Sequence, residues 1–346
     1  MTKTCETQIA LAVIPAGFDA AGGSQYWFER RPSGVDFAGM LALPGGKVAE
    51  GETPPQALAR ELREELGITL TQARLLIEIP WVYPAVPPAV PKRLRLWVYR
   101  VESWLNQSQT PIQGSEGQAV MPVLIDCTQA RALMAQLPAA NRGIVAALCL
   151  PPRIAISQPC AAGDLGFEAW LTSLQATATL LHSRFKGAAV MHLRPQRDLS
   201  RHEWQRAVAV VQAQRVPVWV NADLAIAMAS GADGVHLNRA RLFTEPKEAV
   251  LAWQSLNRWV SASGHNVGEI DRANQLGVDA VLISPVLPTP SHPDALGIGW
   301  AKFADLVRTA TMPAYALGGV SEANLAEAQA LGAQGIAAIR GYGVPN

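Results

Sequence analysis

Eight short apolar segments recur at regular intervals in the second half of the chain, and most are followed by a stretch of helical length. The segments are RIAIS, AAVMHL, VPVWVN, GVHL, RWVSASG, AVLISP, PAYALGG and GIAAIRG. Strands that alternate with helices pair in parallel, because the chain must cross back over the sheet before each new strand. Eight such units favour a closed (β/α)8 barrel, the TIM barrel, over an open sheet.

The first half of the chain follows a different pattern. Four strand-like runs surround one strongly helical segment after Glu52. The runs are QIALAVIP, QYWFERR, ARLLIEIPWVY and KRLRLWVYRVE. The insert PAVPPAVP (84–91) is expected to form a loop between two of them, because proline has no N–H to donate within a sheet. A polar loop at 106–118 and a helix near 141–149 complete this half.

The overall composition limits the class of protein. A length of 346 residues exceeds what one hydrophobic core usually covers, so we expect an α/β protein with two domains, residues 1–150 and 151–346. A formal charge of +1 gives no electrostatic reason to expect stable binding to nucleic acid or to a membrane. Four scattered cysteines indicate neither a zinc site nor a disulfide framework. Without a recognisable signal peptide or membrane span, a cytoplasmic protein is expected.

The stretch GKVAEGETPPQALARELREELGI (46–68) concentrates acidic residues on one helix. Thr53 suits the N-cap and Gly67 the C-terminal stop, so we expect the helix to run from Pro54 to Leu66. At about 100° per residue, three leucines share an arc that must face the core, and three glutamates share the neighbouring arc. These residues are Leu58, Leu62 and Leu66, and Glu61, Glu64 and Glu65.

The acidic arc is unfavourable without a counter-charge, because like charges this close repel one another. A divalent cation would remove the repulsion, and carboxylate oxygens suit Mg²⁺ or Mn²⁺. The glycine turn in LPGGK could add a backbone carbonyl, which we place at Gly45. The alternative is a solvated surface helix that carries i,i+4 pairs such as Arg60–Glu64.

The spacing in this stretch resembles the Nudix box at every defined position: Gly46, five residues, Glu52, seven residues, then Arg60-Glu61-Leu62-x-Glu64-Glu65-x-Gly67-Ile68. The resemblance implies an α/β/α sandwich with a mixed sheet that hydrolyses a nucleoside diphosphate linked to another group. It implies that Glu61, Glu64 and Glu65 are ligands of Mg²⁺. Glu61, or a carboxylate outside the box, would activate the attacking water, while Arg60 and Glu52 would brace the loop–helix turn.

Three further stretches resemble the MutT branch of that family, which converts 8-oxo-dGTP to the monophosphate and pyrophosphate. ERRPSGVDFAGMLALPGGK places Arg31 where the family contacts the nucleotide, and GSEGQ places Glu116 near the metal. LPAANRGIV matches the segment whose asparagine, here Asn141, recognises the oxidised guanine edge. The resemblance also places three residues before and within the box against the substrate: Leu43, Pro44 and Gly46.

Simpler interpretations stay open. Arg31 could be a surface arginine, Glu116 one acid of a polar loop, and Asn141 the cap of the following helix. The chain departs from the family at Asp36, where histidine is usual, and at the Ala-Leu pair before the glycines, where Glu-Phe is usual. Two other functions stay open: hydrolysis of a different diphosphate, such as a thiamin-related one, and non-catalytic recognition of an oxidised base, as in the C-terminal region of the adenine glycosylase MutY.

Residues 153–342 resemble thiamin phosphate synthase and its TenI relatives. The resemblance rests on stretches such as LRPQRDLS, NADLAIAMASGADGVHLNRARL and ALGGVSEANLAEAQALGAQGIAAIRG. It predicts a phosphate site at two turns, Gly318-Gly319 and Arg340-Gly341, where glycine lets backbone amides approach an anion. The same glycines could instead only permit tight turns. His236, within GVHL, is expected in the core.

The resemblance to the synthase also implies that two aspartates hold magnesium pyrophosphate, and this chain lacks both. Ala222 occupies one of the two positions and Arg241 the other. Two lysines of the family are replaced by Gln196 and His292. Because pyrophosphate then has no metal to neutralise its charge, we expect a barrel that binds a small phosphate ester and forms no thiamin phosphate.

Overall fold

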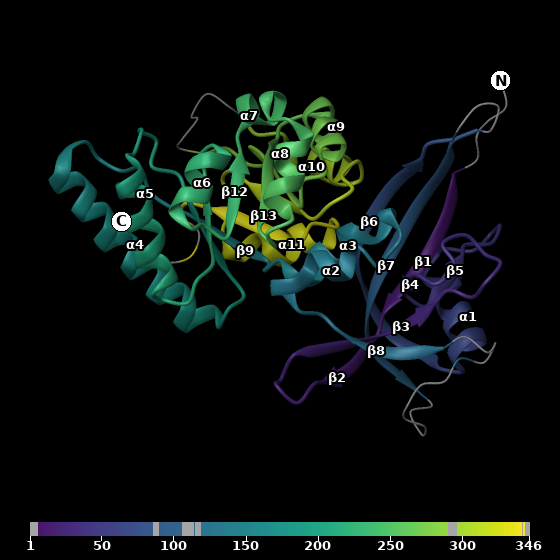
Figure 1. Ribbon diagram of the computed structural model, residues 1–346. Helices are drawn as coiled ribbons and strands as arrows, with labels where there is room; N and C mark the ends of the chain where they lie inside the picture. The colour runs from purple at the N-terminus through teal and green to yellow at the C-terminus, as the bar shows by residue number, and fades with distance from the viewer. Residues whose placement is uncertain are drawn as a thin grey trace. The chain divides into compact units, whose positions relative to one another are not determined.

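The computed structural model describes residues 6–85, 90–105, 114, 119–289, 296–340 and 342. The chain divides into two compact units, Met1–Cys149 and Leu150–Asn346 (Figure 1). Each unit has its own hydrophobic core. Within the described residues, no helix is both long enough and apolar enough to cross a membrane.

The N-terminal unit is built on a mixed sheet with the strand order β5-β1-β7-β6. These strands are Gly45–Lys47 (β5), Thr7–Val13 (β1), Lys92–Leu105 (β7) and Thr69–Tyr83 (β6). The β1–β7 pair is parallel, whereas β5 and β6 run antiparallel to their neighbours. A second sheet contains β2 (Pro15–Phe18), β3 (Ser24–Arg30), β4 (Leu41–Ala42) and β8 (Val120–Leu124). The predicted mixed sheet is therefore confirmed.

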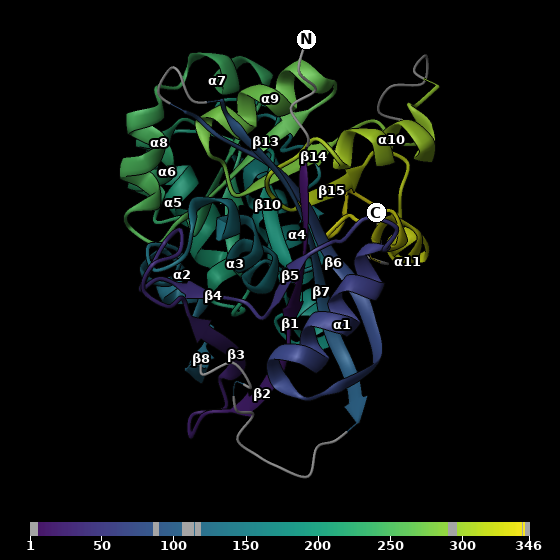
Figure 2. The same ribbon diagram turned by 90° about the vertical axis from the view of Figure 1, so that its right-hand side faces the viewer.

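Helix α1 (Pro54–Leu66) matches the predicted bounds and lies beside β5 (Figures 1 and 2). Its leucine arc is buried: Leu58 and Leu62 are 0% exposed and Leu66 is 6% exposed. Burial of each such side chain contributes about 1.5–3 kcal/mol, which holds the helix on the sheet in one orientation. Gly67 ends the helix in the left-handed conformation (φ 65°), and its N–H donates to Arg63 O. The remaining helical segments of this unit are η1 (Cys127–Gln129), α2 (Ala130–Met134), η2 (Ala139–Asn141) and α3 (Arg142–Cys149).

The C-terminal unit is a closed parallel barrel, and all eight predicted strands are present. The strands are β9 (Arg153–Ile156), β10 (Val190–Leu193), β11 (Val218–Val220), β12 (Gly234–Leu237), β13 (Trp259–Gly264), β14 (Ala280–Ile283), β15 (Ala314–Leu317) and β16 (Gly335–Ala338). Each strand pairs with the next, and β16 closes on β9. The expected (β/α)8 barrel is confirmed.

Helices surround this barrel (Figures 1 and 2). They are α4 (Gly163–Phe185), α5 (Arg201–Gln212), α6 (Leu224–Ser230), α7 (Arg239–Thr244), α8 (Lys247–Gln254), α9 (Val267–Leu276), α10 (Gly299–Val307), η3 (Glu322–Asn324) and α11 (Leu325–Ala330). Successive strand residues alternate between the helices and the barrel interior. Along β10, Met191 and Leu193 join the core under the helices, so His192 between them faces the interior.

Candidate functional site

The first site forms where β5 meets helix α1. Gly45 has φ +129°, and a Cβ there would lie 2.2 Å from the backbone oxygen of Ala10 on β1. A Cβ on Gly46 would lie 2.3 Å from the carboxylate carbon of Glu61. The two glycines therefore serve different purposes. Gly45 lets β5 pair closely with β1, and Gly46 lets the Glu61 carboxylate pack against the strand backbone.

Arg60 is the centre of the charge network on this helix. Its Nε and Nη2 donate to the two oxygens of Glu52 at 2.8 and 3.0 Å, a bidentate pair. Its Nη1 donates to Glu61 at 2.9 Å and to Glu64 at 3.1 Å, and Nη2 also reaches Lys47 O at 3.1 Å. These partners raise the pKa of Arg60, while the hydrogen bonds from Arg60 and from the Ala49 amide lower the pKa of Glu52. Arg60 thus ties the loop before α1 to the acidic face of the helix.

Glu65 joins the same site from the next turn of the helix. Its Oε2 accepts a hydrogen bond from the Gly45 amide at 2.9 Å. The Glu61 side chain is 17% exposed and that of Glu64 is 54% exposed, so the acidic arc runs from the strand surface toward solvent. The carboxylates of Glu52, Glu61 and Glu64 thus share the guanidinium of Arg60, and that of Glu65 accepts from the Gly45 amide.

The chemistry of these side chains suits a hard divalent cation. Carboxylate oxygens are the ligands that Mg²⁺ and Mn²⁺ prefer, and the excess of negative charge favours a cation here. In the structure these carboxylates are hydrogen-bonded to Arg60 and to the Gly45 amide. Among the described residues, no three carboxylate, imidazole or thiol groups converge as a ready metal site. Glu116, also expected near the metal, lies outside the described residues.

Asn141 lies at the end of a buried turn. The residue is 8% exposed, and its backbone N–H donates to Pro138 O at 2.8 Å. Its side chain makes no hydrogen bond to another described residue, so the structure gives no side-chain cap to α3. The neighbouring Ala140 N–H donates to the Tyr83 hydroxyl at 3.3 Å, and the Tyr83 ring lies 5.3 Å from that of Phe37. Sequence reasoning missed both aromatic residues, because chain segments far from position 141 supply them.

The other predicted substrate residues have defined places. Arg31 Nε donates to the backbone oxygen of Asp36 at 2.7 Å, which fixes the loop between β3 and β4. The Asp36 carboxylate pairs with Lys92, and this contact lowers its pKa. Leu43 and Pro44 are buried, so the Leu43 side chain packs in the interior of the unit and not on its surface.

In the barrel, the glycines predicted to bind phosphate have a packing explanation. A Cβ on Gly318 would lie 2.8 Å from Pro285 Cα, and one on Gly319 would lie 2.4 Å from Pro288 O. Both glycines also have positive φ angles, +93° and +69°. The turn after β15 therefore requires glycine whether or not an anion binds there. Arg340 is exposed, and Gly341 lies outside the described residues.

The turns after β11 and β12 show what replaces the two expected aspartates. The Asp223 side chain accepts from the Ile226 N–H at 2.7 Å and caps α6. Arg241 donates to the Asn221 side-chain oxygen at 3.3 Å. His236 is 4% exposed, which confirms that it is a core residue.

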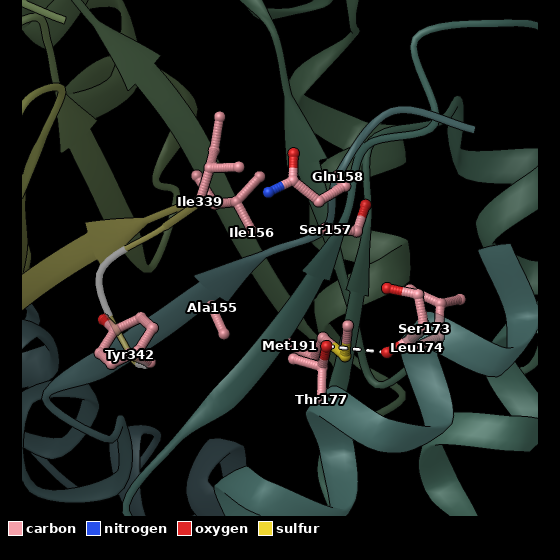
Figure 3. A pocket seen from close by; sticks show the side chains of 10 residues that line it. All are labelled: Ala155, Ile156, Ser157, Gln158, Ser173, Leu174, Thr177, Met191, Ile339 and Tyr342. Carbon is pink, nitrogen blue, oxygen red and sulfur yellow. Dashed lines mark hydrogen bonds between the residues drawn. The ribbon is translucent and has the colours of Figure 1, made fainter. Parts of the chain in front are cut away.

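A small cavity of about 30 Å³ lies between β9, β10 and α4 (Figure 3). Its polar lining comes from Ser157, Gln158, Ser173 and Thr177. The Thr177 hydroxyl donates to Ser173 O at 2.8 Å within the helix. A space of this size holds a few water molecules, so it is too small for a nucleotide.

Fold and site together define an enzyme with a Nudix hydrolase domain ahead of a (β/α)8 barrel. The family model described as thiamine monophosphate synthase matches residues 155–342, and the NUDIX domain model matches residues 12–148. The chain therefore belongs to the thiamine monophosphate synthase family through its barrel and to the Nudix family through its N-terminal domain.

Each of the known relatives below is similar to one of the two domains of this chain. A thiamine-phosphate synthase of Listeria monocytogenes is 32% identical over 170 residues, which are 48% of this chain and 77% of that protein. An 8-oxo-dGTP diphosphatase of Haemophilus influenzae is 39% identical over 111 residues, 32% of this chain and 71% of that protein. A solved thiamine phosphate pyrophosphorylase of Pyrococcus furiosus is 22% identical with a TM-score of 0.41, covering 54% of this chain and 83% of its own.

The two glycines of β5 give a matched pair of variants. Gly46→Ala is expected to lower hydrolysis roughly 100-fold with little change in the melting temperature, because the mobile end of Glu61 can move away from the new methyl group and loses its position. Gly45→Ala should lower the melting temperature, since its Cβ would meet the fixed backbone of Ala10. Turnover and thermal unfolding of both variants check this. Full activity in Gly46→Ala would show that the position of Glu61 does not matter.

Proposed function

We propose that the N-terminal domain hydrolyses oxidised nucleoside triphosphates, converting 8-oxo-dGTP to 8-oxo-dGMP and pyrophosphate and so clearing the nucleotide pool. The observation that carries the proposal is the joint between β5 and α1, where Gly46 admits the Glu61 carboxylate and Arg60 holds three glutamates. The 8-oxo-dGTP diphosphatase of Haemophilus influenzae, similar over this domain, supports the choice of substrate.

Glu61, Glu64 and Glu65, with the Gly45 carbonyl, are the groups that would hold Mg²⁺ or Mn²⁺. When bound, the cation neutralises phosphate charge and polarises the attacked phosphorus–oxygen bonds. Glu61, or a carboxylate outside the box, accepts the proton of the attacking water. Arg60 holds the helix and the loop before it in a fixed relative position through its bidentate bond to Glu52. To hold the cation, Glu61 and Glu64 would give up part of their contact with Arg60.

Asn141 is the proposed recognition group for the oxidised base. Its buried amide offers two donors and one acceptor that other described residues do not use. Tyr83 bonds to the turn that carries Asn141, and the Phe37 ring lies 5.3 Å from the Tyr83 ring; these aromatic rings provide faces on which a base can stack. A base without the oxidised edge would leave the Asn141 amide without hydrogen-bond partners. That loss is costly in a buried site.

Asn141→Ala tests the base assignment. The ratio of kcat/KM for 8-oxo-dGTP to that for dGTP should fall by the equivalent of about 1–3 kcal/mol, the value of a lost buried hydrogen-bonding group. Gln136→Ala is the control, because that side chain is exposed on the same segment and, within the described part of the chain, bonds only to Ala132 O. An unchanged ratio in Asn141→Ala would remove the asparagine from base recognition.

For the barrel we propose a binding function without synthase activity. Alanine at position 222 and arginine at position 241 leave its mouth without the two carboxylates expected there. The nearby Asp223 carboxylate caps α6 instead. The proposed ligand is a small phosphate ester.

A further inference from the structure

Two cysteines that lie far apart in the sequence meet in the N-terminal unit. Cys127 begins η1 and Cys149 ends α3. Helices α2 and α3, which lie between them in the chain, pack against each other (Figures 1 and 2). The two thiols form a hydrogen bond to each other. Both are free cysteines; Cys127 is exposed and Cys149 is half-buried.

The backbone on each side of this contact is anchored separately. The Asp126 carboxylate accepts from the Thr128 N–H at 2.9 Å and from the Thr128 hydroxyl at 2.7 Å, which fixes the first turn of η1. Ile125, just before this turn, donates to Ser24 O at 3.0 Å and joins it to β3. On the other side, Ile144 is 2% exposed and holds α3 in the core. The contact between the thiols is therefore a product of the fold and does not depend on a flexible chain end.

Cys160, in the barrel, has a different setting. It is 6% exposed. Its sulfur accepts from Arg197 Nε at 3.3 Å and donates to Ala161 O at 3.4 Å. Cys160 is therefore shielded from a reagent in solution, whereas the exposed Cys127 is accessible to one.

The contact gives the two thiols of the N-terminal unit different acidities. The hydrogen bond from Cys149 lowers the pKa of the Cys127 thiol, which favours the thiolate, the form that attacks a disulfide. The same hydrogen bond, burial and the charge of the Cys127 thiolate raise the pKa of Cys149. The influence of that thiolate ends once the Cys127 sulfur is bound covalently, while the Arg131 guanidinium still lowers the pKa of Cys149. Cys127 is thus suited to react first and Cys149 second.

We propose that Cys127 and Cys149 form a redox modification site that exchanges with a small-molecule disulfide of the glutathione type. In the first step the Cys127 thiolate attacks one sulfur of the reagent, the S–S bond of the reagent breaks, and one thiolate leaves and takes up a proton. In the second step the Cys149 thiolate attacks the Cys127 sulfur, and the other half of the reagent leaves as a thiolate and takes up a proton. The two protein thiols are oxidised to a disulfide, and the reagent is reduced to two thiols.

The disulfide closes the segment that runs from η1 to the end of α3. This segment includes the turn that carries Asn141. Closing a loop of about 20 residues removes conformational freedom from the unfolded chain and so stabilises the folded state. We expect oxidation to raise the melting temperature of the N-terminal unit by about 5 °C or more.

Oxidation of the full-length chain with oxidised glutathione, followed by peptide mapping without reduction, tests the proposal. Every sample carries Cys5→Ser, which removes the cysteine that lies outside the described residues. The expected product is a peptide pair joined through Cys127 and Cys149, with the mass of two hydrogen atoms lost. Cys149→Ser should instead keep glutathione attached at Cys127, because the thiol that displaces it is gone. Cys127→Ser should react at least roughly tenfold more slowly, since Cys149 is half-buried.

Cys160→Ala is the matched control and should form the same disulfide at the rate of the parent protein. Circular dichroism establishes that each variant is folded. Scanning calorimetry should show the rise in melting temperature in the oxidised parent, its reversal by dithiothreitol, and no rise in Cys149→Ser.

Three results would overturn the inference: no joined peptide pair in the folded parent, no glutathione on Cys127 in Cys149→Ser, or an unchanged reaction rate in Cys127→Ser. All of these measurements are masses, rates of oxidation and melting temperatures. Their outcome is therefore independent of whether the N-terminal domain hydrolyses 8-oxo-dGTP.

Discussion

Replacing Glu61 or Glu65 with glutamine is expected to lower turnover by about a thousandfold or more while the domain stays folded. Glutamine keeps the shape of each side chain. It can still accept the hydrogen bonds that Arg60 gives to Glu61 and that the Gly45 amide gives to Glu65. What it loses is the negative charge, and with it the ability to hold a cation against the phosphates.

Single-turnover and steady-state hydrolysis of 8-oxo-dGTP with Mg²⁺ measure this effect. Glu50→Gln, which changes an exposed acid on the loop before the helix, serves as the control. Circular dichroism and the melting temperature establish the fold of every variant. Near-normal turnover in both Glu61→Gln and Glu65→Gln would mean that the acidic arc is only a solvated helix face.

We also expect the full-length chain to form no thiamin phosphate. That reaction releases pyrophosphate, whose charge must be neutralised as it departs. Here Ala222 and Arg241 replace the two expected carboxylates, and Asp223 is committed to the end of α6. Product formation from the pyrimidine pyrophosphate and thiazole phosphate with Mg²⁺ is the assay.

The thiamine-phosphate synthase of Listeria monocytogenes, 32% identical over 170 residues, is a suitable positive control for that assay. Growth of a thiamin-requiring strain that lacks its own synthase gives a second readout. Product at a rate comparable to the control, or restored growth, would establish the barrel as an active synthase.

Local chemistry made much of the fold predictable. The bounds of α1 follow from Thr53, Pro54 and Gly67, which act within a few residues of the helix ends. The barrel follows from eight apolar runs whose strand and helix periods are visible in the sequence. The Arg60–Glu64 contact at 3.1 Å is also local, since residues four apart on a helix are neighbours.

Contacts between distant segments could not be predicted in the same way. The Tyr83 hydroxyl reaches Ala140 only because β6 and the turn before α3 meet in the folded domain. Arg241 reaches the Asn221 side chain because β11 and β12 are neighbouring strands of the barrel. The glycines after β15 are a different case. Their sequence predicts an anion site, and the structure adds a second reason for glycine, the close approach of the chain near Pro285.

The most direct test of the hydrolase proposal is pyrophosphate release by the purified chain with Mg²⁺, compared across 8-oxo-dGTP, dGTP, ADP-ribose and thiamin pyrophosphate. We predict the highest kcat/KM for 8-oxo-dGTP, with 8-oxo-dGMP and pyrophosphate as products. Hydrolysis of none of the four, or a clear preference for thiamin pyrophosphate, would contradict it.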